Sequence, residues 1–237
     1  MKNLLPLIKK EIQSYFYTPI GYVFAGLLMI VTNWLFFNDL FLSSQADLTP
    51  YWTTMIYLFS IFIPAMTMNS IAEERKNGTW EILLSLPIRE IELVLAKFIG
   101  GFMYLLFIFL LTLPTVVTIG LIGKPDTGIL LSSLLGVVLL SGAYLSFGVF
   151  VSGLTNQPII AFLLTSVGLI LNTFIGQEMF LRRLPTGLGN LIGGFSLTWR
   201  TSRFYDGLIE VQNIVFFLSF ITIFLLLTVL YLKARGK

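Results

Sequence analysis

Long apolar stretches alternate with short charged segments along the chain. Uncharged residues run without a break through five segments, 12–38, 48–72, 98–123, 127–177 and 211–232. A membrane-spanning helix needs about 20 mostly apolar residues, so each of these segments is long enough to cross a bilayer. The pattern therefore predicts membrane-spanning helices.

The fourth segment is too long for a single crossing. As one helix, its 51 residues would measure roughly 77 Å, against a hydrocarbon core of about 30 Å. Only residues 152–157, followed by Pro158, are both polar and rich in helix-breaking residues, so the chain is expected to fold back there. We predict an all-α integral membrane protein, a single domain over 1–237, with six spans at about 19–41, 52–72, 96–119, 128–153, 158–176 and 211–233.

Composition excludes several classes of protein. Of the 237 residues, 56% are hydrophobic and 11% are charged, whereas soluble domains carry about 25% charged residues. Cysteine and histidine are absent, so disulfides, thiolate nucleophiles and the commonest metal ligand are excluded. We expect no catalytic residue, metal or cofactor, and the net charge of +3 is too small to indicate a nucleic-acid partner.

The distribution of lysine and arginine predicts the orientation. Six spans place both termini on one side, and that side carries ten of the fifteen basic residues. Because cytoplasmic loops are enriched in lysine and arginine, both termini are expected in the cytoplasm.

The residues before the first span form an amphipathic pattern. Leu4, Ile8, Ile12 and Phe16 follow a helical period, while Lys9, Lys10 and Glu11 lie mostly off that stripe. We predict an interfacial helix over 2–17, lying on the cytoplasmic membrane surface with its lysines near anionic lipid head groups. The alternative is a simple cytoplasmic extension of the first span.

The first cytoplasmic loop, 71–90, concentrates acidic residues and helix signals. Glu73, Glu74 and Arg75 form a charge cluster, and Asn77-Gly78 predicts a turn. Thr79 or Asn77 can cap a short helix, about 78–87, which has Glu81 in its first turn and ends at Pro87. One face of this helix carries Trp80, Leu83 and Leu84. Such an element could transmit force from a soluble partner into the membrane; the alternative is a loop whose charges only mark the interface.

Two further features concern the interior and the outer side. Asn33, Asn69 and Asn172 are polar residues within the spans, where they could line a translocation path or form hydrogen bonds between helices. The outer segment 177–210 is apolar but rich in glycine, and we expect a re-entrant pair of short helices there before the last span.

The chain lacks the motifs that would supply its own energy. It has no Gly-x-x-x-x-Gly-Lys-[Ser/Thr] phosphate loop, and no titratable residue lies deep in a span. If the protein moves a substrate uphill, the energy must come from another polypeptide.

Residues 68–87, which include Ala72-Glu73-Glu74-Arg75 and Gly78-Thr79-Trp80-Glu81, resemble the charged-loop signature of ABC-2-type transporter permeases. The opening residues 10–24 look like the start of the gliding-motility-associated, GldF-like subgroup. The resemblance extends over essentially the whole chain.

The resemblance implies a permease subunit of an ATP-driven exporter in the bacterial cytoplasmic (inner) membrane. Its partners would be a second permease subunit, identical or different, and separate ATPase subunits that hydrolyse ATP. The loop helix would be the coupling helix, with coupling residues matched at Glu73, Glu74, Arg75, Gly78, Thr79, Glu81, Leu83, Leu84 and Pro87. The rival hypotheses are a non-transporting membrane anchor or scaffold and a secondary carrier or channel. The sequence leaves the substrate open.

Overall fold

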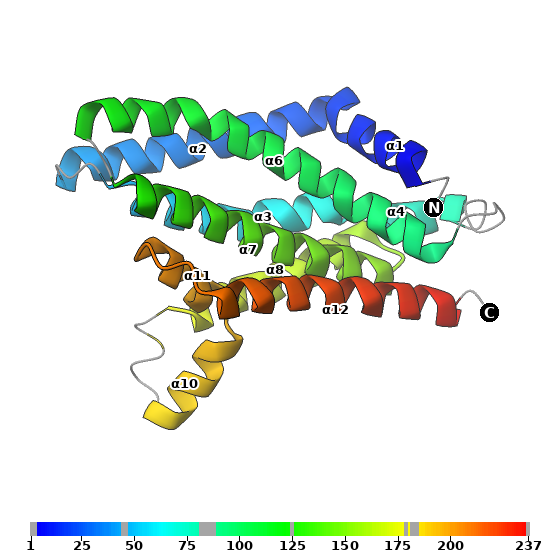
Figure 1. Ribbon diagram of the computed structural model, residues 1–237. Helices are drawn as coiled ribbons and strands as arrows, with labels where there is room; N and C mark the ends of the chain where they lie inside the picture. The colour runs from blue at the N-terminus through cyan, green and yellow to red at the C-terminus, as the bar shows by residue number, and fades with distance from the viewer. Residues whose placement is uncertain are drawn as a thin grey trace.

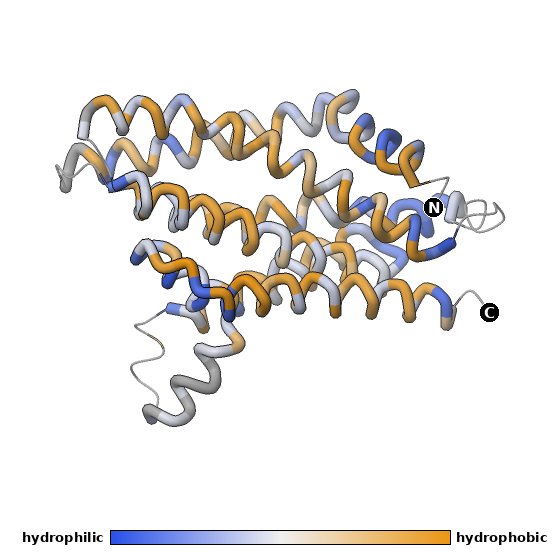
Figure 2. Tube along the Cα trace, viewed as in Figure 1, coloured by the Kyte–Doolittle hydropathy of each residue, from blue (hydrophilic) through white to orange (hydrophobic). Residues whose placement is uncertain are grey.

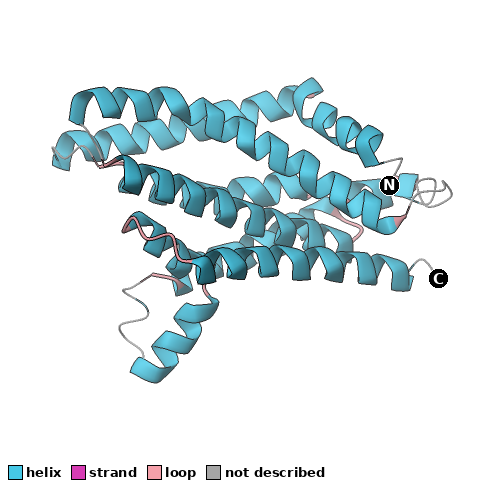
Figure 3. Cartoon of the chain, viewed as in Figure 1, coloured by secondary structure: helices cyan, strands magenta, loops and turns pink. Residues whose placement is uncertain are grey.

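The chain folds as a bundle of long helices in the computed structural model (Figures 1 and 3). The structure describes residues 4–43, 47–80, 89–123, 126–177, 180 and 185–235. No strand occurs in these residues. The helices are α1 (Leu4–Tyr17), α2 (Pro19–Ser43), α3 (Thr49–Thr67), α4 (Ala72–Lys76), α6 (Glu90–Gly123), α7 (Thr127–Leu154), α8 (Pro158–Ile175), α10 (Thr186–Phe195), α11 (Leu197–Tyr205) and α12 (Val211–Arg235).

Within the described part of the chain, six helical stretches are long and apolar enough to cross a membrane. They are Gly21–Leu40, Thr49–Lys76, Glu90–Leu121, Thr127–Leu154, Pro158–Ile175 and Val211–Ala234. Figure 2 shows hydrophobic residues along these helices and hydrophilic residues mainly towards the ends of the bundle. The predicted all-α fold with six spans is therefore confirmed, and the chain is a multi-pass membrane protein. Both termini lie at the same end of the bundle (Figure 1).

Helix α7 is the central helix of the bundle. It contacts α3, α6, α8, α11 and α12, and its small residues let these neighbours approach closely. A Cβ atom added at Gly136 would lie 2.7 Å from the Phe204 Cβ of α11, so only glycine allows this approach. The outer faces of α8 and α12 expose leucine, isoleucine and valine, as expected of helices that face lipid.

The 51-residue apolar stretch forms two helices. Thr155 has an extended backbone at the C-terminal end of α7, and Pro158 occupies the first turn of α8. A proline is tolerated at this position because its missing N–H has no partner within the helix there.

The segment before α12 contains two described helices. The hydroxyl oxygen of Ser196 accepts the N–H of Trp199 and so caps α11. The Ser132 hydroxyl of α7 donates to the carbonyl of Phe204, which also belongs to α11. Helix α10 projects away from the bundle (Figure 1). The re-entrant position of this pair in a membrane stays a prediction.

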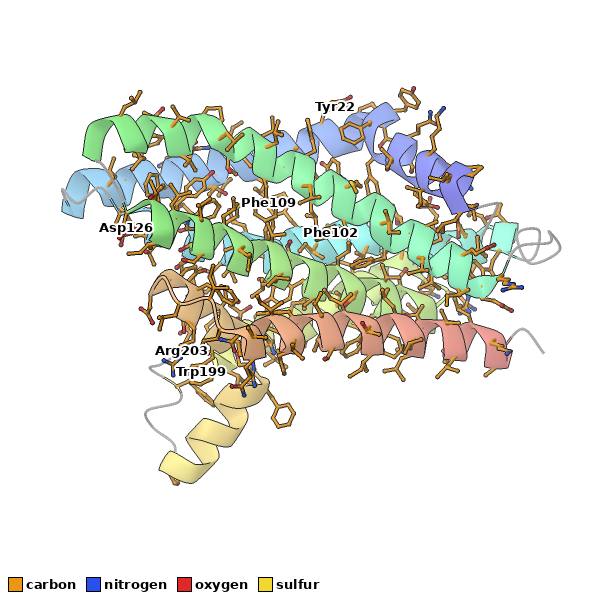
Figure 4. The ribbon with its side chains drawn as sticks, in the orientation of Figure 1. Tyr22, Phe102, Phe109, Asp126, Trp199 and Arg203 are labelled. Carbon is orange, nitrogen blue, oxygen red and sulfur yellow. The ribbon has the colours of Figure 1, made fainter. Side chains whose placement is uncertain are left out.

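The end of the bundle away from the termini carries its own polar contacts. The Asp126 carboxylate accepts the N–H of Gly128 at 2.7 Å and caps α7. The Arg203 guanidinium lies 5.4 Å from the centre of the Trp199 ring in α11, and Figure 4 shows both side chains on the same side of the bundle.

Candidate functional site

The charged cluster predicted after the second span forms the short helix α4. Glu73, Glu74 and Arg75 all belong to it, and it ends at the Asn77-Gly78 turn. Gly78 has a φ of 70°, a left-handed conformation that glycine adopts without steric cost. The Thr79 hydroxyl donates to the Glu74 carbonyl at 3.0 Å, which folds the turn back onto α4.

Helix α4 is fastened to the C-terminal end of α7. The Ser152 hydroxyl oxygen accepts the backbone N–H groups of Ile71 and Ala72 at 3.0 and 3.1 Å. These N–H groups would otherwise be among the unpaired donors at a helix N-terminus, because Ile71 offers no capping side chain. At the other end of α4, the Arg75 guanidinium donates to the Gly153 carbonyl at 2.7 Å.

Trp80 points into the protein. Its side chain is 6% exposed and belongs to a buried apolar cluster, the Trp80 cluster, whose other members are Ile71, Leu93, Val94, Val149 and Leu232. The Arg75 guanidinium lies 5.6 Å from the ring centre, within range of a cation–π interaction. The Trp80 cluster therefore joins Trp80 to α6, α7 and α12. Because the indole is buried there, little of it is left to contact a partner. Glu81, Leu83, Leu84 and Pro87 lie outside the described residues, as does most of the predicted helix 78–87.

A buried lysine joins three helices at this end of the bundle. Lys97 of α6 lies 2.9 Å from a carboxylate oxygen of Glu74 and 3.2 Å from one of Glu11, in α1. The lysine side chain is 4% exposed, and the side chains of Glu11 and Glu74 are 18% and 19% exposed. The three side chains, the Lys97 triad, thus connect the predicted interfacial helix to α4 through α6.

Helix α1 packs along α6, and the chain bends at Thr18 before α2 begins. The Tyr15 and Tyr104 rings stack with centres 5.1 Å apart, and Phe16 contacts Tyr104 edge to face. The Tyr104 hydroxyl donates to the Gly21 carbonyl at 2.5 Å, which fixes the start of α2 on α6. Burial, and then the neighbouring Glu11 carboxylate, raise the pKa of the Tyr15 phenol, so this group stays neutral.

The predicted features of α1 divide between two environments. Glu11 and Phe16 pack against α6, whereas Lys9 and Lys10 are exposed. The contact of these lysines with lipid head groups stays a prediction.

A cavity of about 690 Å³ opens between α1, α2, α3, α4 and α6. Its lining includes Lys10, Asn69 and all three members of the Lys97 triad at one end, and aromatic and aliphatic side chains of the spans at the other.

The three asparagines proposed for a translocation path do not meet. Asn33 accepts a hydrogen bond of 2.7 Å from the Thr115 hydroxyl and so ties α2 to α6. Asn172 accepts the Leu197 N–H at 3.2 Å and ties α8 to α11. Asn69 is exposed and lines the cavity. Asn33 and Asn172 thus form hydrogen bonds between helices, and a role of the three asparagines in a translocation path stays a prediction.

The sequence did not single out Lys97, Ser152 or Tyr104 as parts of a site. Lys97 had a usable signal in the sequence, because it is the single charged residue within the predicted span 96–119. Ser152 and Tyr104 had no such signal, because their partners lie 80 or more residues away. The described residues contain no group of carboxylates placed to hold a metal ion.

A bundle of six apolar helices with a charged, tightly fastened element at one end defines a multi-pass membrane component with a candidate site for a soluble partner. Residues 4–235 match the family described as ABC-2 family transporter protein, so the chain belongs to that family and is a transporter permease. Permeases of this family generally work with an ATP-binding subunit and dimerise. A comparison with curated proteins gave no match.

Proposed function

We propose that this chain is the membrane permease of an ATP-driven exporter, powered by a separate ATPase that binds at the end of the bundle carrying α4. The observation that supports this best is the fastening of α4 and Trp80 to three long helices. A force applied at the Gly78 turn would pass to α7 through Ser152 and Arg75, to α6 through Lys97 and to α12 through the Trp80 cluster.

In this mechanism the turn and the predicted helix 78–87 dock on the ATPase, and the residues before the turn pass the movement inwards. Trp80 then connects the predicted coupling helix to the spans, because its ring is buried in its own chain. Closure of the ATPase pair on ATP would move α4 as a rigid piece and rock two permease subunits about their shared face. Nearly complete switching between two states takes about 5.5 kcal/mol, and burying one large apolar side chain supplies about 1.5–3 kcal/mol.

The α4 end of the bundle is assigned to the cytoplasm of a bacterial cell, facing inwards from the cytoplasmic membrane. The excess of basic residues on that side supports the assignment. The similarity of residues 10–24 to GldF-like subunits supports membership of that subgroup; it carries no role in motility by itself.

The deciding experiment is purification after mild detergent extraction with a tag on this chain. We expect an ATP-binding subunit to co-purify in equal amount with the permease, and ATP turnover to depend on the complex. Gradient-driven flux through liposomes containing this chain alone would contradict the proposal and indicate a carrier or channel. A complex with no ATPase would indicate an anchor.

A further inference from the structure

The cavity beside the Lys97 triad has two chemically distinct ends. Side chains of α2, α3 and α6 form an apolar end: Phe24, Leu28, Phe59, Phe62, Ile63, Leu105 and Ile108. The opposite end carries the charged groups Lys10, Glu11, Glu73, Glu74 and Lys97. A volume of about 690 Å³ lies within the range of about 300–1,000 Å³ that is usual for small-molecule sites.

The two ends fall on either side of the level where α2 becomes apolar enough to span a membrane. That stretch begins at Gly21, whose carbonyl accepts the Tyr104 hydroxyl. Phe24 and Leu28 lie one and two turns further along α2, within the stretch. Lys97 lies seven residues before Tyr104 in α6, which is roughly 10 Å along the helix towards the α4 end. A molecule filling the cavity would therefore have its polar group near the membrane surface and its apolar part among the spans.

The charged end favours a cation that can donate hydrogen bonds. Two lysines and three glutamates give it a formal charge of −1. The Lys97 ammonium is already shared by Glu11 and Glu74. The second carboxylate oxygen of Glu74, Oε2, is buried and accepts no hydrogen bond in the described structure. Because a buried acceptor without a donor is costly, this oxygen favours a ligand that donates a hydrogen bond, and the net negative charge of this end favours a cationic donor such as an ammonium group.

We propose that the cavity binds a single-chain amphiphile with a primary amine head group, its ammonium on Glu74 and its chain between Phe24, Phe59 and Phe62. This deepens the proposed function, because the site would be where the exporter takes its substrate from the inner leaflet. Binding itself needs neither ATP nor an ATPase, so the two proposals fail separately.

The test uses the full chain in phosphatidylcholine nanodiscs and a decylamine that carries a photoreactive diazirine in its chain. We expect the label on residues of α2, α3 and α6 that line the apolar end. Unlabelled decylamine should compete at least about tenfold better than decyl sulfate after correction for partitioning into empty nanodiscs, since one charge-assisted hydrogen bond is worth at least that factor.

Two variants and one control locate the site. Glu74→Gln should weaken decylamine competition at least about tenfold, and Ala65→Phe, which fills the cavity from α3, should reduce labelling whatever the head group. Glu90→Gln makes the same chemical change on α6 away from the cavity and should leave labelling unchanged. Ala65→Phe and the competitor series still decide the matter if Glu74→Gln does not fold.

Three results would overturn the proposal: equal competition by decyl sulfate, labels outside the cavity, or the same response from Glu74→Gln and Glu90→Gln. Retained amine binding in a chain that recruits no ATPase would leave the site standing and remove only its role in export.

Discussion

Ser152 in α7 and Ala72 in α4 are joined by a hydrogen bond of 3.1 Å between the serine hydroxyl oxygen and the backbone N–H of Ala72, across 80 residues of sequence. The same oxygen accepts the N–H of Ile71. One side chain therefore serves as the N-terminal cap of a helix to which it is not adjacent in sequence.

Replacing Ser152 by alanine should loosen α4. It leaves two buried N–H groups without an acceptor, and we expect a loss of about 1–3 kcal/mol in the free energy of unfolding. Ser146→Ala is the control, because the Ser146 hydroxyl is equally buried but bonds only to a carbonyl of its own helix. Thermal unfolding followed by tryptophan fluorescence compares the two, and equal melting temperatures would show that the Ser152 bonds do not hold α4.

Gly100 should be sensitive to a single added methyl group. A Cβ atom there would lie 2.6 Å from the Glu11 Cβ, so alanine would push α1 away from α6. Gly26 has nothing within 4 Å of such an atom, and alanine there should be neutral or stabilising by up to about 1 kcal/mol. We expect Gly100→Ala to lower the melting temperature and Gly26→Ala not to lower it. A stable Gly100→Ala chain would mean that α1 is not held on α6 in this way.

Lys97→Met should be strongly destabilising. It leaves two carboxylates close together and largely buried, and breaking a buried ion pair costs about 3–5 kcal/mol. Adding Glu11→Gln and Glu74→Gln should recover much of this loss, because the uncompensated charges disappear. Lys76→Met removes an exposed lysine and should change the stability by less than about 0.5 kcal/mol. If the two glutamine substitutions do not restore the stability of Lys97→Met, then Lys97 does not stabilise the protein through its pairing with Glu11 and Glu74.

The turn before Trp80 provides a test of coupling. Gly78→Asn should keep activity, because asparagine tolerates the left-handed conformation, whereas Gly78→Pro cannot adopt a φ of 70°. Gly78→Pro and Trp80→Ala should abolish permease-stimulated ATP turnover while membrane insertion persists. Turnover measured in the purified complex decides this, and wild-type rates in both variants would rule out α4 and Trp80 as the transmission path.

Orientation can be tested with single introduced thiols, because the chain has no cysteine of its own and can be purified by its tag after labelling. Asn77→Cys and Asp206→Cys introduce thiols at exposed positions of the α4 turn and of the end of α11. In intact cells, an impermeant maleimide should label Asp206→Cys and should reach Asn77→Cys only after lysis. Labelling of Asn77→Cys in intact cells would place the proposed coupling site on the wrong side.

The architecture was predictable because the membrane imposes a simple rule. Uninterrupted apolar stretches must form helices that satisfy their own backbone groups, and the Pro158 break could be recognised within the fourth stretch. The charged cluster of α4 was recognisable for a related reason, since four adjacent charged residues do not enter hydrocarbon.

The contacts that make up the site were much less predictable. The sequence around Trp80 is the same whether the indole contacts a partner protein or packs inside its own chain. Only the packing of α6, α7 and α12 shows that the indole is buried in its own chain. The pairing of Glu11 with Lys97 spans 86 residues, and no periodicity encodes it. The cavity depends on the relative positions of five helices, which a linear pattern does not contain.

The shared position of Lys97 has a consequence for how the molecule moves. Since Glu11 and Glu74 both hold the same ammonium, α1 and α4 cannot shift independently without giving up a buried charge pair. A movement that starts at the cytoplasmic turn would therefore reach α1 and α4 together, through one shared ammonium.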